Sequence, residues 1–168
     1  MIDDNEHGRS GWRIVANCQR TSDEDLIGPR CPQTGSAGVQ VGCQTVKALL
    51  TEAALGRFKP GDYRFCADAH CDIVYFAATT FFGTVDLRVP VWQKVSSGSR
   101  LLCYCFGESE TSIRAEIESA GSSLCVERIR EHIAAGRCAC EVRNPSGKCC
   151  IKDVLAAVGR IQSEHVTS

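Results

Sequence analysis

The sequence predicts an α+β protein whose first half is rich in β-strands and whose second half is helical. From about residue 29 to 97, short apolar or alternating runs lie between turn residues, a pattern typical of strands. From about residue 100, apolar residues recur at helical spacing instead. This change in period predicts a disordered polar tail over 1–28, a β-rich module over 29–97, a helical module over 98–162 and a tail over 163–168.

The β-rich module is expected to hold three strands and one helix. The strands are expected over 63–65, 71–76 and 87–92, where apolar side chains alternate or run together. The helix is expected over 46–55 and ends at Gly56.

Three helices are expected in the second module. Ser109 can cap the first helix, which would end at Gly121. Ser122 or Ser123 can cap the second, which would end at Gly136. The third helix is expected to carry a row of apolar residues, namely Ile151, Val154, Leu155, Val158 and Ile161.

Cysteine is the most informative residue type, with 12 in a chain of 168 residues. Iron-sulfur clusters need four soft thiolates that converge on a compact inorganic core, and two groups of thiols on separate loops can supply them. The helical module carries such groups just before expected helices, whose N-termini suit a negatively charged cluster. These thiols, which predict an iron-sulfur site, are Cys103, Cys105, Cys138, Cys140, Cys149 and Cys150.

Several classes of protein are disfavoured by the rest of the composition. The N-terminus is acidic and polar, and no window is long and apolar enough for membrane insertion. A cytoplasmic protein is therefore expected, in which reduced cysteines at this density are metal ligands rather than crosslinks. A net charge of −1 gives no electrostatic reason to expect nucleic acid as a partner. No catalytic motif is present, so an enzyme is not expected.

Several short motifs occur along the chain, among them Cys31-Pro-x-x-Gly, Tyr63-Arg-Phe-Cys, Cys71-Asp-Ile-Val-Tyr-Phe, Cys103-Tyr-Cys and Asn144-Pro-Ser-Gly-x-Cys-Cys. Together they resemble the N-terminal domain of CopZ-type copper chaperones, over roughly residues 30 to 160. The resemblance implies a small treble-clef-like zinc module, followed by a helical module that holds a 2Fe-2S cluster and is similar to bacterioferritin-associated ferredoxin.

The same resemblance implies a set of cluster ligands. They are Cys103, Cys105, Cys140 and Cys150, with Cys150 favoured over Cys149 because it leads directly into the third helix. Cys138 stays open as an alternative to Cys140. Cys125 falls on the apolar face of its expected helix and is expected to pack in the core.

The implied zinc ligands include Cys31, Cys66 and Cys71. The family has a fourth cysteine where this chain has Thr34, and a threonine hydroxyl is a poor zinc ligand. The fourth ligand is left open among several candidates, namely Cys43, His70, Asp68, water or no ligand.

The sequence thus predicts a cytoplasmic iron-sulfur protein that acts as a one-electron redox or accessory protein in copper or other soft-metal handling. The resemblance implies a metal transporter or chaperone as the partner. The Cys-x-x-Cys pair that such chaperones use to carry copper is missing from this sequence. The alternative is a non-redox interaction or sensor module, in which the cluster and zinc are structural.

Overall fold

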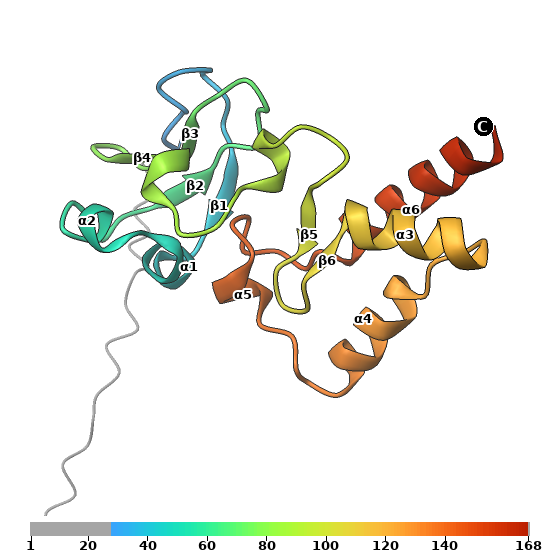
Figure 1. The fold of residues 1–168 in the computed structure, drawn as a ribbon. Coiled ribbons are helices and arrows are strands. Elements are labelled where there is room, and N and C mark those ends of the chain that lie inside the picture. The colour runs from blue at the N-terminus through green and yellow to red at the C-terminus, as the bar shows by residue number, and fades with distance from the viewer. Residues whose placement is uncertain (1–27, 168) are drawn as a thin grey trace, which may run out of the picture.

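The computed structural model describes residues 28–167 and has an α+β architecture (Figure 1). A four-stranded antiparallel sheet with short helices forms the first part of the chain, and a hairpin with longer helices forms the second. The α+β class is therefore confirmed. The expected polar tail lies outside the described residues except for Gly28.

The sheet consists of β1 (Val39–Val41), β2 (Tyr63–Phe65), β3 (Ile73–Phe76) and β4 (Phe81–Gly83), in that spatial order. All neighbouring strands are antiparallel. Burial of aromatic side chains holds the sheet together, because each removes a large apolar area from water. The fully buried aromatic residues of these strands are Tyr63, Phe65, Tyr75, Phe76 and Phe82.

Two short helices replace the single helix expected over 46–55. They are α1 (Cys43–Leu49) and α2 (Glu52–Leu55), and the backbone between them is extended at Leu50. Thr51 starts α2 because its side chain accepts a hydrogen bond from the backbone N–H of Ala54. The break lets Leu50 and Ala54 both point into the sheet core.

The strand expected over 87–92 was wrong. Leu87 forms only an isolated bridge with Leu50, and the segment continues into the 3-10 helix η2 (Trp92–Lys94). Arg88 donates its backbone N–H to the Leu49 carbonyl, so this segment pairs with the end of α1 rather than with the sheet. Pro90 has no N–H to give to a sheet ladder.

The second part begins with a hairpin of β5 (Leu101–Cys103) and β6 (Glu108–Ser109). The helices α3 (Glu110–Ala120), α4 (Cys125–Ala134), α5 (Cys140–Arg143) and α6 (Ile151–Val166) follow. Helix α6 runs beyond the boundary expected at residue 162, so residues 163–166 are helical.

The caps expected for α3 are confirmed. Ser109 accepts a hydrogen bond from the backbone N–H of Ser112, and Gly121 ends the helix in the left-handed region with φ 77°. For α4 the N-cap is Leu124 instead of a serine. Ser123 still contributes there, because its hydroxyl accepts from the backbone N–H of Cys125.

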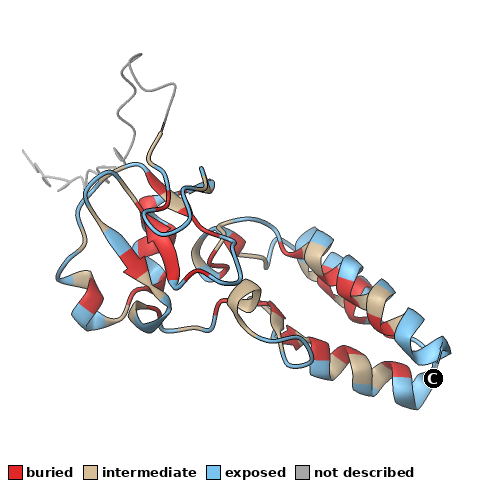
Figure 2. Ribbon diagram, turned by 90° about the horizontal axis from the view of Figure 1, so that it is seen from above, coloured by how far each residue is buried: buried red, intermediate tan, exposed pale blue. Residues whose placement is uncertain are grey.

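A second core lies between the helices and the hairpin. Figure 2 shows buried residues on the facing sides of the longer helices. Cys125 is fully buried in this core, which confirms that it is a packing residue. Its other main members are Leu102, Ile113, Ile117, Ile129, Val154 and Ile161.

The two parts are joined where α1 packs against α5. Thr45 in α1 donates a hydrogen bond to the carbonyl of Glu141, and the buried Tyr75 hydroxyl donates to the carbonyl of Pro145 at 2.8 Å. Gly147 has φ 65°, and a Cβ added there would lie 3.2 Å from Val41 Cγ2. The sheet therefore holds in place the loop that precedes Cys149 and Cys150.

Over the described part of the chain, none of the helices combines the length and the apolar character needed to span a bilayer.

Candidate metal centres

The first centre gathers three thiols of the sheet module, Cys31, Cys66 and Cys71. Their sulfur atoms lie within 4.8 Å of one another, and Cys31 Sγ is 3.6 Å from Cys71 Sγ. Cys66 follows β2 and Cys71 precedes β3, so antiparallel pairing brings them together. A tight turn presents Cys31, because Gly35 donates its N–H to the Cys31 carbonyl.

These three thiols fit the requirements of zinc. Tetrahedral zinc with Zn–S bonds of about 2.3 Å places two sulfur ligands roughly 3.8 Å apart, close to the Cys31–Cys71 distance. Burial raises the pKa of Cys31, but hydrogen bonds from the Thr34 hydroxyl and from backbone N–H groups outweigh it and lower the pKa to about 7. Burial raises the pKa of Cys71 to about 12. A bound cation would allow all three thiols to ionise.

The structure does not bring the expected candidates for the fourth ligand to this group. Cys43 lies at the start of α1 in the sheet core, with its sulfur 3.3 Å from the carbonyl oxygen of Gly61. Asp68 and His70 are exposed, and the Asp68 carboxylate accepts the backbone N–H of His70. None of these three residues belongs to the metal-ligating group that the described residues form around Cys31.

Oxygen atoms face the three thiols instead. Thr34 Oγ1 lies 4.0 Å and Ser36 Oγ 3.8 Å from Cys66 Sγ, while Gln33 Oε1 lies 3.3 Å from Cys71 Sγ. Sequence reasoning missed Gln33 and Ser36. Their place in the same short turn as Cys31 was the available signal, although spacing alone does not fix where their side chains point.

The second centre gathers five thiols from four parts of the helical module. Cys103 ends β5, Cys105 lies in the hairpin turn, Cys138 precedes α5, Cys140 is the first residue of α5, and Cys150 is the N-cap of α6. Cys140 Sγ is 3.8 Å from Cys105 Sγ and 3.4 Å from Cys138 Sγ. The sulfur atoms of Cys105, Cys138 and Cys140 lie within 4.8 Å of one another, and the buried Cys103 and Cys150 belong to the same core.

Neighbouring thiols shift one another's pKa values in this centre. Hydrogen bonding with Cys150 lowers the pKa of Cys140 to about 5 and that of Cys103 to about 7. The same hydrogen bonds raise the pKa of Cys150, and burial raises the pKa of Cys105 to about 12. Crowded thiols cannot all ionise without a compensating cation, so this donor set suits a metal or cluster that supplies positive charge.

Backbone and cationic groups also lie beside Cys105. The backbone N–H of Ala139 donates to Cys105 Sγ at 3.4 Å, and the Arg143 guanidinium donates to the Cys105 carbonyl at 3.2 Å. Cys149, by contrast, is exposed. Three of the five thiols are thus buried and two are half-buried, and a cation contacts the backbone of Cys105.

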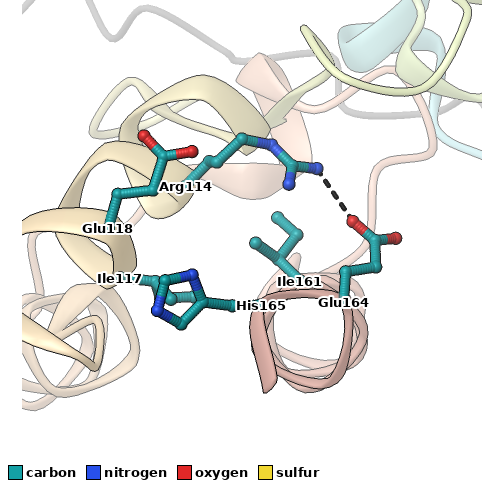
Figure 3. A pocket seen from close by; sticks show the side chains of 6 residues that line it. All are labelled: Arg114, Ile117, Glu118, Ile161, Glu164 and His165. Atoms are coloured by element: carbon teal, nitrogen blue, oxygen red, sulfur yellow. Dashed lines mark hydrogen bonds and ion pairs between the residues drawn. The ribbon is translucent and has the colours of Figure 1, made fainter. Parts of the chain in front are cut away.

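A small hollow between α3 and α6 carries none of this chemistry (Figure 3). Its volume is about 150 Å³, and an ion pair between Arg114 and Glu164 at 2.9 Å spans it. It lies at the opposite end of α6 from Cys150 and contains no thiol. The metal chemistry therefore belongs to the two thiol centres.

Comparison with known proteins agrees with this arrangement. A family model described as a zinc binding domain matches residues 28–88, which include all three thiols of the first centre. The copper chaperone CopZ of Archaeoglobus fulgidus is 34% identical over 122 residues, which are 72% of this chain and 57% of that protein. The chain thus matches little more than half the length of that chaperone.

The solved N-terminal domain of A. fulgidus CopZ is similar in structure as well. It superposes with a TM-score of 0.61 at 32% identity, and the match covers 76% of this chain and 96% of that domain. The structural match covers 76% of this chain, which is more than residues 28–88 alone. The similarity therefore extends from the zinc-binding region into the helical part. The chain therefore belongs to the family of the CopZ N-terminal domain, with its zinc-binding module at residues 28–88.

Proposed function

We propose that this protein holds a 2Fe-2S cluster in its second centre and zinc in its first, and that it serves as a one-electron accessory in the handling of copper or another soft metal. The observation that carries the proposal is the convergence of thiols from β5, the hairpin turn, α5 and α6. A cluster of this kind supplies one-electron chemistry when bound.

The proposed ligands are Cys103, Cys105, Cys140 and Cys150. Cys140 is favoured over Cys138 because it is buried and its sulfur lies 3.8 Å from Cys105 Sγ, whereas Cys138 is only half-buried. Cys150 is favoured over Cys149 because it is buried in the same core as Cys103 and Cys140, whereas Cys149 is exposed. These four side chains would fix the cluster between the hairpin and the N-terminus of α6, where backbone N–H groups favour negative charge.

The role in metal handling rests on the relatives. The similar protein from A. fulgidus is a copper chaperone, so copper and a metal transporter or chaperone are the proposed metal and partner, and the cytoplasm is the proposed location. No Cys-x-x-Cys pair occurs in this sequence, so we propose an accessory role rather than direct carriage of copper.

Metal analysis after purification without air tests the proposal. We expect about two iron, two labile sulfide and one zinc per chain. Cys105→Ala should lose the visible spectrum and the iron but keep zinc, because Cys105 lies outside the first centre. Cys125→Ala is the matched control, since Cys125 is a buried thiol of the same core and should keep both metals. A full cluster in Cys105→Ala would contradict the ligand assignment.

Redox titration separates the one-electron role from the structural alternative. A reversible couple with unchanged iron content is expected for the redox accessory. Loss of the cluster on reduction would favour a sensor or interaction module.

A further inference from the structure

One side of the first metal centre is built from oxygen rather than sulfur. The three thiols of Cys31, Cys66 and Cys71 are buried, whereas Gln33 and Thr34 are exposed and Ser36 is half-buried. The thiols therefore close three sides of the site, and small polar side chains line the side that faces solvent.

None of these oxygens is arranged as a zinc ligand. Protein ligands of zinc are thiolate, imidazole and carboxylate, and a neutral hydroxyl is not among them. The Thr34 hydroxyl donates to Ser36 Oγ at 3.2 Å and accepts from the backbone N–H of Ser36 at 3.4 Å. Gln33 Oε1 accepts from both Cys71 Sγ and the backbone N–H of Asp72 at 3.2 Å. Each oxygen thus already has a hydrogen-bonding role around the thiols.

A hydroxyl donor and two cations lie near the three thiols. The Ser36 hydroxyl, which accepts the Thr34 proton, can itself donate to a sulfur atom on the uncovered side, since it lies 3.8 Å from Cys66 Sγ. Lys94 donates to the carbonyl of Cys71 at 2.7 Å, and Arg30 donates to the carbonyl of Gly35 at 3.1 Å. These groups would offset the added negative charge of an anionic fourth ligand.

We propose that metal in this centre is held by three thiolates, and that its fourth position is exchangeable and takes an exogenous thiolate from a small thiol or from a cysteine of a partner protein. An open fourth position binds water until another ligand displaces it. A metal held by three soft sulfur ligands prefers a soft donor in the remaining position. The inference rests on the zinc half of the proposed function.

X-ray absorption at the zinc edge tests the inference, because it reports only the atoms bound to zinc and is unaffected by iron. Protein purified without added thiol should show about three sulfur neighbours and one oxygen neighbour. Thr34→Cys should show about four sulfurs and no oxygen. Thr34→Val should keep the oxygen, because that atom is expected to come from solvent and not from the threonine.

Addition of a thiol should change the atoms bound to zinc in the wild-type protein but not in Thr34→Cys. With 2-mercaptoethanol, the oxygen neighbour of the wild type should be replaced by a fourth sulfur, while Thr34→Cys stays the same. A second titration uses a short peptide with a single cysteine. Binding of the small thiol alone identifies a free thiol as the ligand, and binding of both probes shows that a partner's cysteine can reach the site.

Zinc release to a chromogenic chelator gives an independent readout, and Thr34→Cys should lose zinc more slowly than the wild type. Four sulfurs in the thiol-free wild type, loss of the oxygen in Thr34→Val, or no response to either thiol would overturn the inference while leaving the zinc site intact. A protein that contains no zinc would instead contradict the zinc half of the proposed function.

Discussion

At the scale of single residues, two cations lie near the thiols of the second centre. Arg143 donates to the carbonyl of Cys105, one of the proposed cluster ligands, and Lys148 is an exposed cation on the loop that precedes Cys150. A cluster with four thiolate ligands becomes more negative on reduction, so a nearby cation stabilises the reduced form.

Replacing Arg143 should therefore lower the reduction potential. For Arg143→Gln we expect a shift on the order of tens of millivolts, larger at low salt than at high salt because Arg143 is exposed. Lys148→Gln should give a smaller shift. Redox titration with iron content checked in each variant measures both, and an unchanged or raised potential in Arg143→Gln would show that its charge does not act on the cluster.

Glu110 is a second residue whose surroundings allow a sharp prediction. Its side chain is 1% exposed, accepts the backbone N–H of Gly98 at 2.5 Å and forms an ion pair with Arg160. Glu110→Ala would leave that N–H and part of the Arg160 charge without a partner, so it should lower the free energy of unfolding by about 3 kcal/mol.

Glu164 supplies the matched control for this substitution, because it also pairs with Arg160 but is largely exposed. Glu164→Ala should leave stability unchanged within error. Urea unfolding of both variants, with metals retained, makes the comparison. Equal effects of the two substitutions would show that burial of Glu110 does not determine how much it contributes to the free energy of unfolding.

At the scale of elements, two side chains from the sheet module fix the loop that leads into α6. Tyr75 of β3 donates to Pro145, and Thr45 of α1 donates to Glu141. Burial raises the pKa of the Tyr75 phenol above its ordinary value, so it stays a donor at all working pH values. The sheet thus helps to position Cys150, although Cys150 belongs to the other core.

Removal of the Tyr75 hydroxyl should loosen this attachment. Tyr75→Phe leaves the buried Pro145 carbonyl without its donor, which costs about 1–2 kcal/mol, and should speed cluster loss in air while zinc is retained. Tyr63→Phe is the control, because its hydroxyl bonds to Lys59 within the sheet module. The decay of visible absorbance measures cluster loss, and equal rates in the two variants would contradict the prediction.

At the scale of the whole molecule, the two metal centres lie beside two separate hydrophobic cores. The sheet core and the helical core share no buried residue, and each adjoins its own group of thiols. Loss of one metal should therefore affect mainly its own module.

Selective removal of zinc by a chelator tests this independence. Amide exchange should increase around residues 31–36 and 66–76, because structural zinc contributes folding free energy directly. The visible spectrum of the cluster should persist. Simultaneous loss of both signals would mean that the modules unfold together through the contact between α1 and α5.

Local patterns in the sequence were enough to predict those features that depend only on residues close together along the chain. Helix α3 begins at Ser109 and ends at Gly121 as predicted, because caps act on adjacent backbone groups. The strand at 63–65 and the buried Val154 and Ile161 of α6 also follow from local periodicity, whereas Leu155 of the expected apolar row is exposed. The family resemblance, carried by short motifs, was confirmed by the comparisons.

Tertiary packing decided the features that depend on distant parts of the chain. The segment at 87–92 pairs with the end of α1 instead of the sheet, and Cys43 lies in the sheet core rather than beside Cys31. Spacing along a chain does not fix distances between its loops, because loop positions follow from how the strands and helices pack. For the same reason, only the folded structure shows that Gln33 and Ser36 line the uncovered side of the first centre.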